Sequence, residues 1–171
     1  MRILVVGSMN MDIVTNVQRH PLPGETIHGR RTAFYSGGKG ANQAVAAVRA
    51  GAAVFMAGAL GHDFFGQEIR RLLSEDGIDL SYVRTKEETT GTALITIDES
   101  GENNIILSPG ANGAYAPDDL ADLAFASFDA VLLQNEIPWD VNARVLEICA
   151  SLPTRVYYNP APAHPIEKKY L

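Results

Sequence analysis

The sequence predicts an α/β fold in which a mostly parallel β-sheet is covered by helices, with a small second sheet beside it. Short apolar runs such as 2–6 and 130–134 have the length and the β-branched content of strands buried on both faces. Helical patterns such as 64–75 alternate with these runs, as in βαβ units. Two segments, about 13–35 and 89–109, instead alternate like exposed strands and interrupt that order.

Capping residues and turns give the order of the elements between these segments. Gly51 closes a predicted helix over 41–50, and Asp63 is a candidate N-cap for the helix over 64–75. A buried strand over 53–58 lies between the two helices. The remaining predicted elements, in chain order, are a helix from 117 to about 126, a strand over 130–134, a helix over 141–150 and a strand over 155–158.

The two interrupting segments are expected to leave the main sheet. Prolines and a glycine punctuate the first, and turn residues over 98–103 divide the second into two strands. Paired with each other, they would form a small sheet that covers a site in the same domain. The chain of 171 residues fits one domain, 1–171, with lid segments at about 13–35 and 89–109.

Composition and sequence patterns limit the kinds of molecule that the protein is expected to bind. The formal net charge is -6, and no basic run is present, which argues against nucleic-acid binding. No apolar run approaches the length of a membrane span, and a strand pattern follows Met1 at once, without the layout of a signal peptide. Cys149, the single cysteine, is expected to be a buried, inert thiol. We therefore expect a cytoplasmic protein without membrane or nucleic-acid partners.

The stretch Ser36-Gly37-Gly38-Lys39-Gly40-Ala41-Asn42-Gln43 precedes a predicted helix and is the strongest local signal. Its glycines allow close backbone approach and positive φ. The N–H groups of the first helical turn are expected to be free, and they would form a polar cradle with the side chains of Lys39 and Asn42. The stretch predicts a small ligand rich in oxygen atoms. A tight loop that packs the helix on a strand is the alternative.

Polar residues also follow two of the predicted buried strands. Asn10 and Asp12 come after the strand over 2–6, and Glu136 ends the strand over 130–134. Ligands of open α/β sheets bind outside the carboxyl ends of such strands, so these three side chains could line one pocket. Turn chemistry is the alternative for Asn10 and Asp12, and a solvated loop carboxylate is the alternative for Glu136.

Several familiar sites are excluded by spacing. Lys39 is followed by Gly40, whereas a P-loop needs Ser or Thr there. The glycines follow an exposed segment instead of the first strand, which argues against a dinucleotide fingerprint, and no Gly-x-Ser-x-Gly elbow is present. The histidines lack the spacing of metal ligands and are expected at the surface or in turns: His20, His28, His62 and His164.

The glycine stretch through Ala44, followed by Gly51 and Gly61, resembles the first signature of the ribokinase-like (PfkB) carbohydrate kinases. Further pieces match this family in the right order along the chain. They are residues 7–12, Pro23-Gly24-Glu25-Thr26, Gly61-His62-Asp63 with Gly66, Gly110-Ala111-Asn112 and Asn159-Pro160-Ala161-Pro162-Ala163.

The resemblance implies a Rossmann-like sheet with a β-sheet lid and ATP-dependent transfer of a phosphoryl group to a sugar hydroxyl. ATP, Mg²⁺ and K⁺ would be the cofactors of the complete enzyme, and the lid would make a homodimer contact. Ile105 and Leu107 would belong to the lid over the sugar. The implied sugar-binding residues are Asn10, Met11, Asp12, Gly38, Lys39, Gly40, Ala41, Asn42 and Glu136.

The second family signature, which would carry the catalytic base, has no match in this sequence. The same holds for the motifs of the nucleotide and potassium sites. We therefore expect the C-terminal half of the family fold to be missing and the base to lie beyond Leu171, and we assign no catalytic residue in this chain.

Three hypotheses remain open. The complete chain could phosphorylate D-ribose to ribose 5-phosphate. This chain could instead be a non-catalytic, sugar-binding or dimerising fragment. The complete chain could also be a kinase of the same family that acts on another sugar or on a nucleoside, because Asp12 and Lys39 do not choose among polyols.

Overall fold

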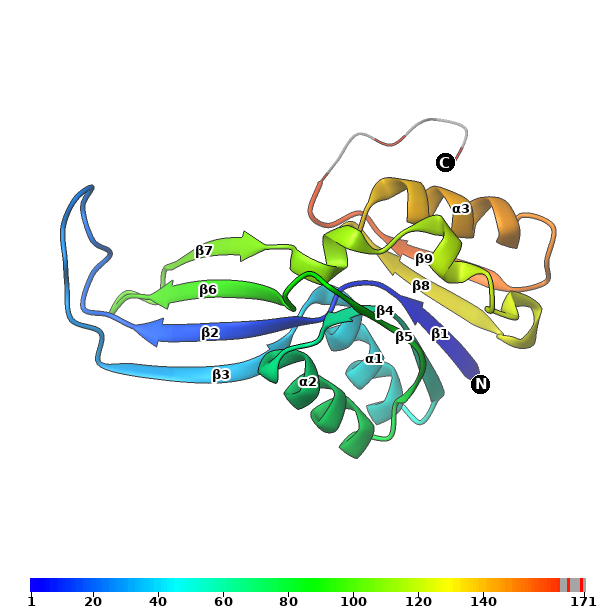
Figure 1. Ribbon diagram of the computed structural model, residues 1–171, viewed down its shortest axis with the longest axis horizontal. Helices are drawn as coiled ribbons and strands as arrows, with labels where there is room; N and C mark the ends of the chain where they lie inside the picture. The colour runs from blue at the N-terminus through cyan, green and yellow to red at the C-terminus, as the bar shows by residue number, and fades with distance from the viewer. Residues whose placement is uncertain (164–165, 167–169, 171) are drawn as a thin grey trace.

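Two separate sheets organise the chain in the computed structural model, which describes residues 1–163, 166 and 170 (Figure 1). His164, which was expected at the surface or in a turn, lies outside the described residues. The larger sheet is parallel throughout, with strand order β5-β4-β1-β8-β9. Its strands are β1 (Arg2–Val6), β4 (Ala53–Gly61), β5 (Asp79–Lys86), β8 (Ala130–Gln134) and β9 (Arg155–Asn159).

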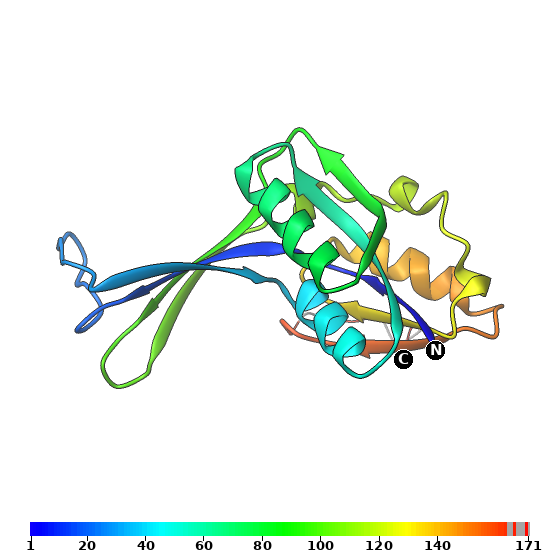
Figure 2. The same cartoon turned by 90° about the horizontal axis from the view of Figure 1, so that it is seen from below.

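Helices cover both faces of the larger sheet, as the alternating pattern predicted. Helices α1 (Lys39–Arg49) and α2 (Phe64–Glu75) lie on one face, and α3 (Trp139–Cys149) lies on the other (Figures 1 and 2). A buried apolar cluster fills the space under each layer. Cys149 is buried in the cluster beneath α3, where burial raises the pKa of its thiol. In the described part of the chain, no helix is long and apolar enough to cross a membrane.

The smaller sheet projects away from the larger one as a long, separate layer (Figure 1). It is mixed, with strand order β3-β2-β6-β7. Its strands are β2 (Asn10–Asn16), β3 (Arg31–Gly37), β6 (Gly91–Ile97) and β7 (Asn103–Ser108). The chain enters this sheet directly after β1, so Asn10 and Asp12 lie on a strand, and the alternative that they form a turn is wrong.

The pairing register decides which side chains share a face of the small sheet. Asp12, Ala93 and Leu107 lie opposite one another across β2, β6 and β7. Ile95 and Ile105 form the neighbouring pair two residues further along. Because side chains alternate between faces along a strand, these five residues lie on one face of the sheet.

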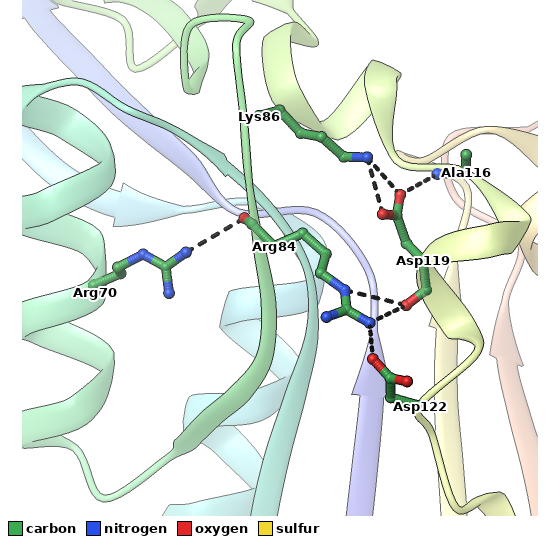
Figure 3. Close-up of polar contacts among 6 residues, drawn as sticks. All are labelled: Arg70, Arg84, Lys86, Ala116, Asp119 and Asp122. Atoms are coloured by element: carbon green, nitrogen blue, oxygen red, sulfur yellow. Dashed lines mark hydrogen bonds and ion pairs between the residues drawn. The ribbon is translucent and has the colours of Figure 1, made fainter.

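The helix predicted from 117 to about 126 is wrong. This segment instead contains the short 3-10 turns η2 (Pro117–Leu120) and η3 (Phe125–Ser127). Contacts from β5 hold this segment: the Arg84 guanidinium donates to the Asp119 carbonyl oxygen at 3.0 Å and to the Asp122 carboxylate at 2.8 Å (Figure 3). The Asp119 carboxylate is also held, by Lys86 Nζ at 2.7 Å and by Ala116 N at 2.8 Å. In an α-helix the Asp119 carbonyl oxygen would accept from Leu123 N, but Leu123 N donates to the Leu120 carbonyl oxygen at 3.1 Å instead.

Strand β5 was not predicted, although Ile78, Leu80 and Tyr82 alternate with Asp79 and Ser81. It pairs with β4 on one side only and is the edge of the larger sheet. Arg70 of α2 donates to the Val83 and Arg84 carbonyl oxygens at 3.2 and 3.3 Å. Side-chain contacts thus join this edge strand to α2 and to η2.

Asp63 is the N-cap of α2, as predicted, and it also binds the start of the small sheet. Its Oδ1 accepts hydrogen bonds from Gly66 N (2.8 Å) and Thr90 Oγ1 (2.7 Å), and its Oδ2 accepts one from Thr90 N (2.7 Å). Burial raises the pKa of Asp63, but the hydrogen bonds from Thr90 and Gly66 outweigh it, so the pKa is below its ordinary value. The carboxylate therefore couples α2 to the segment that enters β6.

We predict that Asp63→Ala lowers the free energy of unfolding by about 1–3 kcal/mol at pH 7, since it removes an N-cap and leaves Thr90 without its acceptor. A group with a lowered folded-state pKa stabilises the fold above its unfolded pKa of about 3.9, and this contribution is lost as the pH falls through the folded value. Urea unfolding should therefore show a smaller difference between wild type and variant at acid pH. Asp76→Ala, at the other end of the helix, is the control and should change stability little. An equal loss in both variants would contradict the prediction.

Candidate functional site

A small cavity of about 180 Å³ lies between the two sheets, beyond the carboxyl ends of β1 and β8. Polar side chains and backbone from the β1–β2 junction, α1 and the end of β8 form one side, and apolar side chains of β6 and β7 form the other. The lining residues are Asn10, Asp12, Gly38, Lys39, Asn42, Ala93, Ile95, Ile105, Leu107 and Glu136. The structure thus brings together residues up to 126 positions apart in the numbering, from Asn10 to Glu136.

The glycine stretch lets the start of α1 approach the end of β1. Gly38 is the N-cap residue of α1 and has φ 89, a conformation that favours glycine. A Cβ on Gly40 would lie 2.6 Å from the backbone nitrogen of Ser8, and a Cβ on Gly37 would overlap the Asp12 carboxylate. Glycine at 40 therefore allows α1 to pack on the β1–β2 junction, and glycine at 37 leaves room for the Asp12 side chain.

The first turn of α1 does not form the predicted cradle of free N–H groups. Acceptors within the protein occupy these groups, because Ser8 and Glu136 reach the helix start from the ends of β1 and β8. The bonds run from Lys39 N to Glu136 Oε2 (2.8 Å), from Gly40 N to Ser8 Oγ (3.3 Å), from Ala41 N to Ser8 O (2.9 Å) and from Asn42 N to Gly38 O (2.9 Å). The N–H groups of residues 39–42 are therefore not free to bind a ligand.

Two carboxylates and one ammonium group dominate the charge of the cavity. Glu136 Oε2 also accepts a hydrogen bond from Ser8 Oγ at 2.6 Å, and Glu136 Oε1 lies 3.3 Å from Lys39 Nζ. Burial and the nearby Glu136 charge raise the pKa of Asp12, and Lys39 opposes this rise. With both carboxylates ionised, these three groups carry a net negative charge. Such a site disfavours an anion, whereas it offers acceptors and donors to the hydroxyl groups of a neutral polyol.

The opposite wall of the cavity is apolar and belongs to the small sheet. Ala93 pairs with Leu107, and Ile95 pairs with Ile105, on the face that also carries Asp12. Ile105 and Leu107 were predicted here and line the cavity. Ala93 and Ile95 were missed, although the alternation in their strand would have placed them on the same face as each other.

Three of the residues named from the sequence do not line the cavity. The side chains of Met11 and Ala41 are buried in the apolar cluster beneath α1 and α2, and Gly40 packs against Ser8. Their sugar contacts remain a prediction, but the structure gives these residues a supporting position behind the cavity. Asn112 was missed as a site residue, although it lies directly behind Asn10 and donates to that side chain. Its only sequence signal was its place in a family motif.

A family model and individual relatives point to the same family of proteins. A family model described as pfkB family carbohydrate kinase matches residues 1–171. The ribokinase of Lactococcus lactis is 43% identical over an alignment of 165 positions, and this match covers 95% of this chain and 55% of that protein. The ribokinase of Bacillus subtilis is 40% identical over an alignment of 172 positions, and this match covers 98% of this chain and 58% of that protein. The chain therefore spans somewhat more than half the length of these curated relatives.

A solved structure extends the likeness to the fold. The ribokinase of Arabidopsis thaliana, solved in complex with ribose and ATP, superposes with a TM-score of 0.79 at 36% identity. That match covers 90% of this chain and 52% of the other. Fold, order of motifs and relatives agree with the resemblance seen in the sequence, and the chain belongs to the pfkB family of carbohydrate kinases.

Proposed function

We propose that the complete protein to which this chain belongs transfers the γ-phosphoryl group of ATP to D-ribose, giving ribose 5-phosphate, and that this chain holds the sugar. The observation that carries the proposal is the cavity with Asp12, Lys39 and Glu136 opposite an apolar wall. Its charge suits a neutral polyol. The ribokinase relatives, and the Arabidopsis ribokinase solved with ribose and ATP, support ribose as that polyol.

In this proposal the chain contributes binding, orientation and exclusion of water. Sugar hydroxyl groups donate to Asp12 and Glu136, and Lys39 and Asn42 donate to sugar oxygens. The wall around Ile105 and Leu107 covers the carbon skeleton and keeps water from the transferred phosphoryl group. Phosphoryl transfer depends mainly on positioning and on electrostatic stabilisation, so a rigid sugar site is a substantial part of catalysis.

The cofactors are proposed for the complete protein and are not assigned to residues of this chain. Among residues 1–163, 166 and 170, no group of three or more His, Cys, Asp or Glu side chains could hold a metal ion. We assign neither Asp12 nor Glu136 as the catalytic base, which we expect, with the ATP site, in the part of the protein beyond Leu171.

We also propose that the lid makes a homodimer contact. The small sheet carries large apolar side chains that are open to solvent on both faces. Ile105 and Ile106, neighbours on β7, are 55% and 66% exposed, and Phe34 on β3 is 58% exposed. A second copy of the chain would bury such side chains.

The sugar preference tests the main proposal. In a coupled assay of ADP release by the complete protein, we predict that kcat/KM for D-ribose exceeds that for fructose or adenosine by about tenfold or more. Weak activity on ribose beside strong activity on another sugar or on a nucleoside would overturn the ribose assignment. Titration calorimetry of the 171-residue chain addresses the fragment hypothesis, because a folded chain that binds no sugar would lack the proposed role.

Asp12 and Glu136 should differ in their effects on stability. Because the folded state raises the pKa of Asp12, it binds that proton more tightly than the unfolded state does, and stability falls as the pH rises through this range. Ionised Asp12 therefore destabilises the fold at neutral pH. Glu136 instead accepts hydrogen bonds from Lys39 N and Ser8 Oγ, which would lose their acceptor without it.

We predict that Asp12→Asn leaves the free energy of unfolding unchanged or higher at pH 7 but weakens ribose binding about tenfold or more, since a charged acceptor is lost. Glu136→Ala should weaken binding and also lower stability by about 1–3 kcal/mol. Thermal unfolding and titration calorimetry of both variants measure the two effects. A large loss of stability in Asp12→Asn would contradict the division of roles.

If the lid makes the homodimer contact, replacing apolar residues of β7 by charged residues should dissociate the dimer into monomers. The side chains of Ile105 and Ile106 point to opposite faces of the sheet, so Ile105→Asp and Ile106→Asp probe the two faces separately. We expect at least one variant to sediment as a monomer where the wild type sediments as a dimer. Unchanged sedimentation of both variants, or a monomeric wild type, would refute the contact.

A further inference from the structure

Asn112 lies behind the sugar cavity and is almost completely buried, with 1% of its surface exposed. It belongs to η1 (Gly110–Ala114), the turn that follows lid strand β7. Its side chain accepts a hydrogen bond from Met9 N (2.9 Å) and donates to Met9 O (3.0 Å) and to Asn10 Oδ1 (2.8 Å). One amide thus joins the return of the lid to the β1–β2 junction.

The backbone of Met9 fixes the orientation of the Asn112 amide. The Met9 N–H group can only donate, so the atom facing it must be the acceptor Oδ1 of Asn112. The Met9 carbonyl oxygen can only accept, so it must face the Nδ2 group. The second hydrogen of Asn112 Nδ2 is then directed to the side chain of Asn10, which must present its oxygen.

This arrangement fixes the orientation of Asn10 in turn. Because Asn10 Oδ1 is held by Asn112, the Nδ2 group is the end of the Asn10 amide left for the cavity. No partner for Asn10 Nδ2 is found among the described residues. Glycine at position 91 leaves room for the pair, since a Cβ there would overlap both amide side chains.

We propose that Asn112 is a positioning residue for the sugar site, which makes Asn10 a hydrogen-bond donor toward the bound sugar. The inference rests on the proposed function and specifies one of its contacts. Asn10 and Asp12 lie on the same face of β2, two residues apart. A sugar hydroxyl group between them accepts from Asn10 and donates to Asp12, and such consecutive hydrogen bonds strengthen each other.

A double-mutant cycle on ribose affinity tests the inference in the complete protein. The variants are Asn10→Ala, Asn112→Ala and the double variant, measured by titration calorimetry with ribose. We expect Asn112→Ala to weaken ribose binding about tenfold in the wild-type background and less than about twofold in the Asn10→Ala background. A loss of the same factor in both backgrounds would overturn the proposal, because Asn112 would then act independently of Asn10.

Asn104→Ala removes an exposed amide from β7 and is the matched control. It should leave ribose affinity unchanged in both backgrounds. If Asn112→Ala does not fold, Asn112→Ser replaces it in the same cycle, since serine keeps a small polar group beside Met9 but is too short to reach Asn10. The proposal predicts the same non-additive result for this variant, and an additive result overturns it.

The failure of the proposed function gives a different result from the failure of this inference. If the complete wild-type protein binds no ribose, or if Asn10→Ala leaves ribose affinity unchanged, the sugar assignment of the site fails first. If wild type binds ribose and Asn10→Ala weakens binding, while the loss caused by Asn112→Ala is additive, only the positioning role of Asn112 fails.

Discussion

The Glu136 carboxylate at the start of α1 is the interaction on which the rest of the site depends. It accepts hydrogen bonds from Lys39 N and Ser8 Oγ and lies beside the Lys39 ammonium, so it joins the end of β8 to the start of α1 and the end of β1. A helix start normally favours anions from outside the protein. Here the protein supplies the anion itself through Glu136, which agrees with the neutral ligand of the proposed function.

The second constraint is that two sheets must meet at one cavity. The chain passes from β1 to β2 within a few residues, so the strand that carries Asn10 and Asp12 begins where the larger sheet ends. The pairing of β2 with β6, and of β6 with β7, then sets which side chains face Asp12. Since a shift of one residue would turn Ile105 and Leu107 to the other face, the register of the small sheet determines the apolar wall.

Sequence patterns predicted those features of the fold that depend on residues close together in the sequence. The period of apolar residues gave most strands and helices, and Asp63 was recognised as an N-cap from the residues that follow it. The occupied N–H groups of α1 could not be predicted, because the acceptor for Lys39 N is Glu136, 97 residues away. The contact that η2 makes with β5 is also distant in the sequence, because Arg84 lies 35 residues before Asp119. For Asn10, Asp12 and Glu136, the sequence indicated one sheet edge but not the partners that orient them.

The proposed role of Asn112 was harder still to predict from the sequence, because it follows from the direction of hydrogen bonds as well as from position. The distances alone would allow either orientation of an amide, and only the donor and acceptor of the Met9 backbone decide between them. Donors and acceptors also matter for Asp12. Its carboxylate accepts no hydrogen bond from any described residue, and burial, together with the nearby Glu136 charge, raises its pKa. In the proposed function, a sugar hydroxyl group would donate to this carboxylate, so sugar binding would stabilise a charge that has no hydrogen-bond donor among the described residues.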